Sequence, residues 1–169
     1  MWNHTETGKE LLAYTKFMID MRKEHRILHG RTPLRRIDTL SCGFPDISFH
    51  GREAWRPDTS SASRCMGIMY CGFYAGEDGQ ENERFFYIAV NMHWQAAYLG
   101  LPKLPKGKLW TYAASTGKEI PEIEETAASS QEICVPGRTI VLCATKDVPV
   151  ETEKNSRKKS KKNRGDEQG

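Results

Sequence analysis

In residues 9–28 the apolar and the charged side chains recur with the period of an α-helix. Charged side chains lie mostly on one side, and the apolar ones recur at steps of three and four: Leu11, Tyr14, Phe17, Met18 and Met21. Thr7 stands three residues before Glu10, which is the spacing of a capping box at a helix start. Because one such helix cannot bury its apolar stripe alone, we expect it to pack on the rest of the chain or on another domain.

Beyond residue 39 the pattern changes to that of short strands. Four runs rich in aromatic and β-branched residues are predicted strands, namely 66–71, 84–91, 109–113 and 139–144. Weaker candidates are 46–50 and 131–135. The turn signal Gly76-Glu77-Asp78-Gly79 makes the first two strong strands neighbours. The pattern therefore predicts a mainly β fold, an antiparallel β-sandwich preceded by one amphipathic α-helix.

Length and composition exclude several classes of protein. A chain of 169 residues fits one domain with appendages, whereas a complete α/β barrel needs about 250 residues. No run approaches the roughly 20 apolar residues of a membrane span, and the N-terminus lacks the pattern of a secretory signal. The five cysteines are odd in number and widely spaced, so we expect reduced thiols and a cytoplasmic protein.

The net charge of +3 is concentrated at the C-terminal end. From Glu153 onward seven basic residues face three acidic ones, a net +4, which leaves residues 1–152 with a net −1. A nearly neutral body is not typical of a protein that binds a polyanion along its surface, so nucleic acid is not expected as a partner of the body. We expect residues 151–169 to form a disordered basic tail.

The segment from Phe44 to Trp94 carries three distinctive phrases. They are Pro45-Asp46-Ile47-Ser48-Phe49-His50-Gly51, Trp55-Arg56-Pro57-Asp58 and Asn91-Met92-His93-Trp94. Together they resemble the C-terminal β-domain of glycogen-debranching enzymes of the isoamylase type, members of the α-amylase superfamily of glycoside hydrolases. The loop 102–107 and the turn 136–138 are also similar to that domain, and the resemblance covers residues 9 to about 145.

The resemblance implies a division of the chain into three parts. Residues 1–38 would be the remnant of a catalytic barrel's last helix with its connecting loop, residues 39–150 the C-terminal β-sandwich domain, and residues 151–169 the tail. Met1 would then lie just inside the end of a truncated catalytic domain. The whole enzyme would hydrolyse α-1,6 branch linkages in glycogen or similar α-glucans. The family's catalytic carboxylates lie in the barrel and have no counterpart here, so we expect this chain alone not to be an enzyme.

Few residues offer chemistry of their own. Asp46 and Asp58 are the best carboxylate candidates, but both lie beside prolines, where Asp commonly caps a turn. The spacing of His50, His93, Cys65 and Cys71 matches no zinc motif, so we expect no metal and no cofactor.

Sugar binding is the more serious local hypothesis, because sugar rings stack on exposed aromatic side chains. The candidates for contact with a sugar or with the barrel are Trp55, His50, Asp46, Asp58 and Trp94. Aromatic residues beside strands usually pack in a core, and this also applies to Trp110 and Tyr98. Trp55 is the best candidate for exposure because its segment is polar.

Two other functions stay open. The first is a free-standing carbohydrate-binding module, whose retention by glycogen would depend on Trp55. The second is a nucleic-acid adaptor that acts through the basic tail, with strongly salt-dependent binding. No aromatic residue is interleaved with the basic residues of 157–162, so the stacking part of a single-strand nucleic-acid site is absent from that run.

Overall fold

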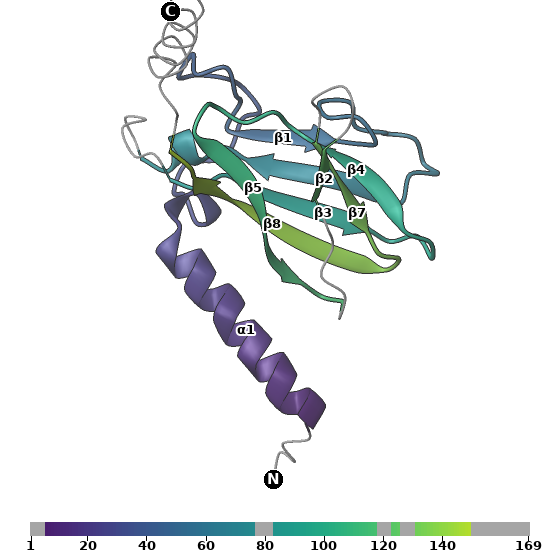
Figure 1. Ribbon diagram of the computed structural model, residues 1–169. Helices are drawn as coiled ribbons and strands as arrows, with labels where there is room; N and C mark the ends of the chain where they lie inside the picture. Colours follow the sequence, from purple (N-terminus) through teal and green to yellow (C-terminus); the bar gives the residue numbers. More distant parts are fainter. Residues whose placement is uncertain (1–5, 77–82, 118–122, 126–130, 150–169) are drawn as a thin grey trace, which may run out of the picture.

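The computed structural model describes residues 6–76, 83–117, 123–125 and 131–149, and Figure 1 shows their arrangement. The fold is mainly β with one N-terminal helix, as the sequence predicts. In chain order the elements are α1 (Glu6–Glu24), the 3-10 helix η1 (Arg26–Leu28), β1 (Ile47–His50), β2 (Cys65–Tyr70), the 3-10 helix η2 (Gly72–Tyr74), β3 (Phe86–Asn91), β4 (Ala97–Leu101), β5 (Lys108–Ser115), β6 (Ile123–Glu125), β7 (Gln131–Val135) and β8 (Thr139–Asp147).

The strands form two antiparallel sheets. The larger sheet has the order β1-β2-β3-β8-β5, and the smaller has the order β4-β7-β6. In the larger sheet β3 lies at the centre, where Phe86 pairs with Tyr70 of β2 on one side and with Ala144 of β8 on the other. In the smaller sheet β4 pairs with β7 along its whole length, and in Figure 1 these two strands lie across β2 and β3.

The space between the two sheets holds the main hydrophobic core. Its buried members come from both sheets: Met69, Cys71, Phe85, Tyr87, Ala89, Leu99, Leu101, Trp110, Ile133, Val135, Val141 and Cys143. The alternation of a strand sends Tyr87 and Ala89 into this core. The ring of Phe85 packs between the rings of Phe44 and Phe73, with centroids 5.6 and 5.1 Å away.

A second, smaller cluster covers the outer face of the larger sheet. Phe86 of β3 and Leu142 of β8 are buried there, together with Ile27 of η1. From α1, Tyr14 and Met21 pack against this cluster. The run 85–90 is therefore apolar at almost every position because both faces of β3 are covered.

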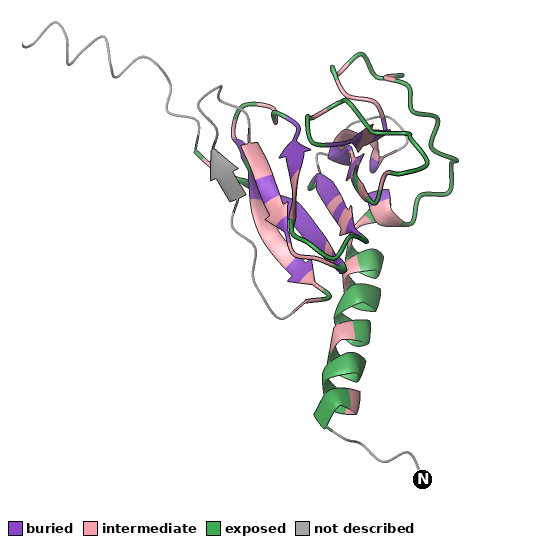
Figure 2. Ribbon diagram, turned by 90° about the vertical axis from the view of Figure 1, so that its right-hand side faces the viewer, coloured by how far each residue is buried: buried purple, intermediate pink, exposed green. Residues whose placement is uncertain are grey.

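Helix α1 has no buried residue of its own. Figure 2 shows it almost wholly exposed, projecting from a β-sandwich whose interior is buried. It begins at Glu6, so Thr7 lies inside its first turn and not at the N-cap, and the predicted capping box is wrong. It ends at Glu24, four residues before the predicted end, and η1 continues the turn to Leu28.

The predicted strands are confirmed, and two strands were missed. β4 was not predicted: its five residues, interrupted by Gly100, lie directly before the loop predicted at residues 102–107. β6 was overlooked because its three residues lie in an acidic run. β2 and β3 are antiparallel neighbours, as predicted. The predicted turn at residues 76–79 lies partly outside the described residues, and the predicted tail at residues 151–169 lies wholly outside them. No helix in the part of the chain that is described is both long and apolar enough to cross a bilayer.

Candidate functional site

Asp46 lies at the start of β1 and is buried. Its carboxylate accepts hydrogen bonds from three backbone N–H groups: those of Arg35 at 2.6 Å, Arg36 at 2.8 Å and Ile47 at 2.7 Å. A carboxylate with these partners ties the connecting segment to the sheet. The structural role expected for Asp46 is therefore confirmed, but two of its three partners are 10 and 11 residues away, so it anchors a distant segment instead of capping a local turn.

His50, at the end of β1, is fully buried and holds the backbone of Trp55. Its Nδ1 accepts from the Trp55 N–H at 2.8 Å, so its proton is on Nε2, which lies 2.8 Å from Ser48 Oγ. Burial lowers the pKa of His50 to about 4, so the ring is neutral at physiological pH. His50 therefore has no direct contact with a ligand and acts by positioning Trp55.

Trp55 is held in an unusual conformation at the surface. Its φ of 69° is in the left-handed region, which a bulky residue rarely adopts. Its ring packs against His50 and Phe44, with centroids 4.9 and 6.2 Å away, yet 43% of the residue is exposed. The exposure predicted for Trp55 is confirmed. Strain of this kind persists where the surroundings fix it, and it is frequent at binding sites.

The loop that carries Trp55 is fixed against β4 by close backbone contacts. A Cβ at Gly100 would lie 2.4 Å from the backbone N of Ala54, so this position needs glycine. The Gly100 N–H donates to the Gly51 carbonyl at 3.0 Å, and its own carbonyl accepts from the buried Tyr87 hydroxyl at 3.0 Å. Loop 51–58 is therefore a rigid part of the sandwich.

Asn91 organises the turn between β3 and β4. This buried residue donates from Nδ2 to the carbonyls of Gln95, Val135 and Pro136. Its Oδ1 accepts from the His93 N–H at 2.9 Å and from the Cys65 thiol at 3.1 Å. The sequence phrase that contains Asn91 thus marks a structural hub, and sequence reasoning had not selected Asn91 as a site residue.

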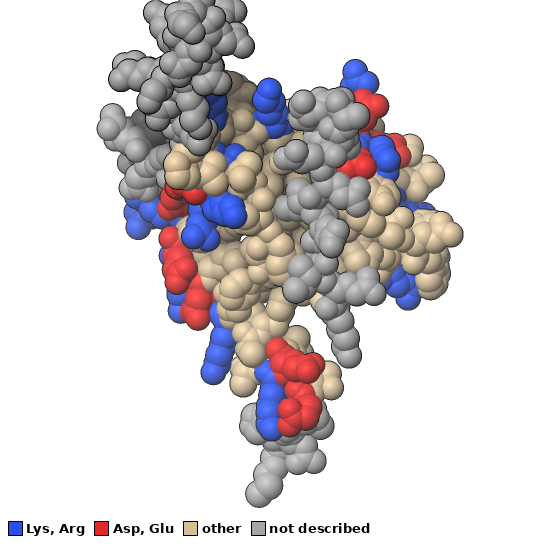
Figure 3. Space-filling view, in the orientation of Figure 1, with Lys and Arg blue, Asp and Glu red and all other residues tan. Residues whose placement is uncertain are grey.

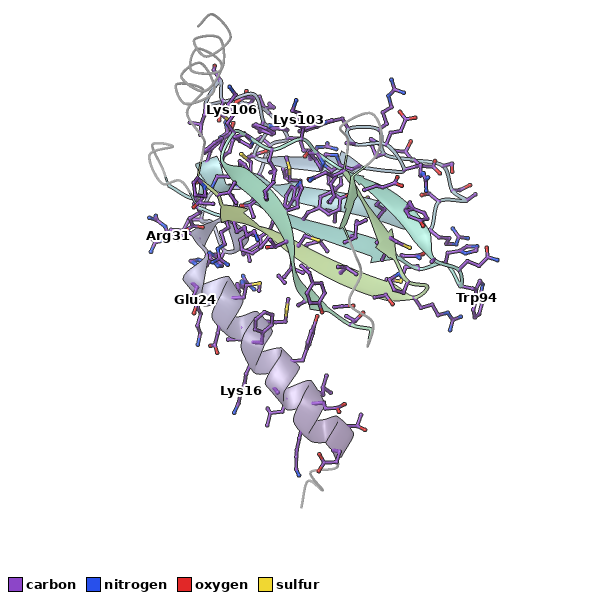
Figure 4. All side chains as sticks on the ribbon, viewed as in Figure 1. Lys16, Glu24, Arg31, Trp94, Lys103 and Lys106 are labelled. Carbon is purple, nitrogen blue, oxygen red and sulfur yellow. The ribbon has the colours of Figure 1, made fainter. Side chains whose placement is uncertain are left out.

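Trp94 stands at the tip of this turn, at the end of the sandwich away from α1 (Figure 4). It is 74% exposed, more than Trp55, against the expectation that an aromatic residue beside a strand packs in a core. The Arg138 guanidinium lies over its ring at 3.5 Å from the centroid. Such cation–π stacking holds one face of the indole.

A cleft of about 410 Å³ lies between the Trp55 loop and β4. Its polar lining comes from three segments: Arg52 and Asp58, then Ser63 and Arg64, and finally His93 and Tyr98. The Arg52 guanidinium lies 4.8 Å from the Tyr98 ring centroid and 3.7 Å from Glu132. We call this hollow the β4 cleft.

Asp58 is the carboxylate of the β4 cleft and is fully exposed. It accepts from the Ser60 N–H at 2.9 Å, and this hydrogen bond lowers the pKa of its carboxyl. The turn-capping role expected from the sequence is confirmed, and the ionised carboxylate keeps acceptor capacity toward the cleft.

A larger hollow of about 890 Å³ lies at the foot of α1, between η1, the segment 28–35 and the tyrosines 70 and 74. Asp46 is its one lining carboxylate, and Asp58 is the one carboxylate that lines the β4 cleft. Glycoside hydrolysis uses two carboxyl groups roughly 5–10 Å apart across the bond. Neither hollow offers that pair among the described residues.

Cys65 and Cys143 are poorly suited to act as nucleophiles. All five cysteines are free thiols, and burial raises the pKa of Cys65 and raises that of Cys143 to about 12. A thiol with a raised pKa is a poor nucleophile near neutral pH. The described residues include no group of three or more His, Cys, Asp or Glu side chains that could hold a metal ion.

Charged side chains of both signs are mixed on the face shown in Figure 3, along α1 and the adjoining edge of the domain. The described residues visible on this face form no single-sign stripe of the kind that binds nucleic acid.

The structure therefore separates the five candidates that the sequence proposed. Asp46 and His50 are buried supports, Asp58 lines the β4 cleft, Trp55 is exposed on the adjoining loop, and Trp94 is exposed at the β3–β4 turn. The cleft also contains Arg64 and His93, which sequence reasoning had not proposed as sugar contacts. The phrase that includes His93 was the available signal. Comparison of the chain with models of protein families and with curated protein sequences found no match.

Proposed function

We propose that this chain is the non-catalytic C-terminal accessory domain of a glycogen-debranching enzyme of the isoamylase type, and that α1 and the segment after it pack against the catalytic α/β barrel. The proposal draws its enzyme class from the resemblance of the phrases between Phe44 and Trp94. Its physical support is the surface of α1.

The observation that carries the proposal is a second apolar face on α1. Tyr14 and Met21 contact the sandwich, whereas Leu12 and Ile19 lie roughly 200° around the helix from them at 100° per residue. Leu12 is 46% exposed and Ile19 is 48% exposed. A helix that is apolar on two sides is typical of one buried between two layers, and the sandwich supplies one of them.

The segment between η1 and β1 extends this apolar surface. Leu34, Ile37 and Leu40 are all exposed, and Asp46 fixes the segment by its hydrogen bonds to the backbone of Arg35 and Arg36. An ordered segment with several exposed apolar side chains is typical of an interface. We therefore assign α1 and residues 34–40 to the barrel contact.

The test mixes the 169-residue chain with an isoamylase-type catalytic barrel that lacks its own C-terminal domain. We expect a complex in sedimentation velocity, and we expect the chain alone to release no reducing ends from glycogen. Full burial of Leu or Ile contributes about 1.5–3 kcal/mol. The double variant Leu12→Ser, Ile19→Ser should therefore weaken the complex by at least roughly 10-fold.

The matched control is Asp20→Ser, because Asp20 is exposed on α1 and lies roughly 80–120° around the helix from both faces at 100° per residue, so it should leave the complex unchanged. Hydrolysis of glycogen by the chain alone would overturn the proposal. So would equal binding by the wild-type chain and the Leu12→Ser, Ile19→Ser variant.

A further inference from the structure

The β4 cleft is a built feature with a fixed shape and not a chance gap between loops. One wall is loop 51–58, locked by Gly100 and by His50, and the other is the turn organised by Asn91. Its volume of about 410 Å³ is in the range of small-molecule sites, about 300–1,000 Å³. A rigid cleft of this size pays little ordering entropy when a ligand binds.

The charges around the cleft balance each other. Arg52 lies beside Glu132 at 3.7 Å, and the Arg64 Nη1 donates to the carbonyls of Ser61 and Ser63 at 3.0 Å each. Asp58 adds a carboxylate to the lining. This balance favours an uncharged ligand over a phosphate, a nucleic acid or a metal ion.

The same lining offers both donors and acceptors of hydrogen bonds. His93 is exposed, and its Nδ1 accepts from the Gln95 N–H at 3.1 Å, so the neutral ring carries its proton on Nε2 and can donate. Asp58 can accept, and so can the Ser63 hydroxyl, which itself donates to the Cys65 carbonyl at 3.3 Å. Vicinal hydroxyl groups of a sugar ring, which donate and accept together, match this mixture.

Tyr98 is the aromatic residue that lines the cleft. Trp55 and Trp94 do not line it, although Trp55 is on the loop that supplies Arg52 and Asp58, and Trp94 directly follows His93 in the sequence. Trp55 and Trp94 are exposed by 43% and 74%. The Tyr98 ring therefore provides the aromatic surface in the cleft against which a sugar ring can pack.

From these features we propose that the β4 cleft binds glucosyl units of an α-glucan, with Asp58 and His93 as hydrogen-bonding residues. The choice of α-glucan among neutral sugars rests on the proposed function. The site is a binding site only, and it lies on the sandwich, with no residue from α1. Glucan would therefore be held at a place distinct from the surface assigned to the barrel.

The experiment is affinity electrophoresis of the 169-residue chain in gels that contain glycogen, with maltoheptaose as the soluble competitor. We expect the wild type to be retarded and the competitor to release it. Loss of one hydrogen bond contributes about 0.5–1.5 kcal/mol, so His93→Ala and Asp58→Asn should each weaken binding roughly 2- to 10-fold. Asn at position 58 keeps a carbonyl oxygen for the Ser60 N–H, so the turn is retained.

The matched controls are His29→Ala and Asp20→Asn, exposed residues outside the cleft, which should migrate like the wild type. Unretarded migration of the wild type would overturn the proposal, as would equal retardation of the wild type and both cleft variants. If glycogen retards the chain but no complex with the barrel forms, the proposal that the β4 cleft binds glucan is supported and the proposed function is wrong. A barrel complex without retardation would leave the proposed function intact and remove the cleft proposal.

Discussion

The β-sandwich and helix α1 differ in how far they bury their apolar side chains. The two sheets enclose their core so completely that Phe85, Tyr87, Ile133 and Val141 have no exposure. The helix, in contrast, has 19 residues and buries none of them. Since helical stability in proteins comes mostly from packing of an apolar face, the sandwich is a self-sufficient unit and α1 is not.

The contrast separates residues that maintain the fold from residues available for binding. Buried polar groups of the sandwich, including Asn91 and His50, use their hydrogen bonds internally. Most of the exposed large apolar residues lie on α1, on residues 34–40 and at the two tryptophans, and the others are Met66, Met92 and Leu109. Substitutions in the two regions should therefore have effects of very different size.

The largest effect is expected for Phe85→Ala. Phe85 is fully buried between Phe44 and Phe73, and removal of a buried Phe ring costs about 3–5 kcal/mol because it also leaves a cavity. Urea unfolding followed by circular dichroism measures the loss. A loss below about 1 kcal/mol would mean that the sandwich core is not closed as described.

The second effect is a pH dependence of stability that comes from His50. Its pKa is 6.5 in the unfolded chain and about 4 in the folded protein because it is buried. Between these values the unfolded chain takes up a proton that the folded protein does not, so the free energy of unfolding falls as the pH falls from 6.5 toward 4. The full difference is on the order of 3 kcal/mol, at about 1.4 kcal/mol per pKa unit.

Urea midpoints at pH 4.5 and pH 7 test this prediction, with His50→Asn as the comparison. The variant should lose less stability than the wild type over this interval, because Asn does not titrate. Equal losses in both proteins would place the pH dependence on other groups.

A smaller effect is expected for Asp46→Asn, which tests the hydrogen bonds that connect the sandwich to the exposed segment 34–40. The Asn amide would present N–H donors toward one of the backbone N–H groups that the carboxylate now serves. Leaving such a group unpaired costs about 1–3 kcal/mol. Hydrogen exchange should accelerate at Arg35 and Arg36 while the amides of β3 keep their protection, and uniform acceleration would contradict a local role.

The smallest effect is expected for Phe17→Ala, the counterpart of Phe85→Ala in the helix. Phe17 is 41% exposed, and surface substitutions usually change stability by no more than about 0.5 kcal/mol. The same urea titration measures it. A loss comparable with that of Phe85→Ala would show that α1 is part of the sandwich core and would remove the contrast between the two regions.

The sequence by itself determined the mainly β fold, most of the strands and the existence of α1. These features follow from local periodicity, which depends on which side of each element is apolar. It also identified Asp58 as a turn cap, because a short carboxylate beside proline bonds to nearby backbone, whereas the bonds from Asp46 to the backbone of Arg35 and Arg36 depend on the tertiary structure. The exposure of Trp55 followed from its polar neighbours.

Only the tertiary structure decided which apolar surfaces are buried against another element. The pattern of α1 cannot tell that Tyr14 and Met21 reach the sheet while Leu12 and Ile19 do not, because apolar residues look alike in sequence whether or not they have a partner. The burial of His50 and the exposure of Trp94 likewise depend on contacts with distant strands. The β4 cleft joins residues from 51 to 99, and such a meeting of remote segments follows from the packing of the two sheets and not from any local pattern.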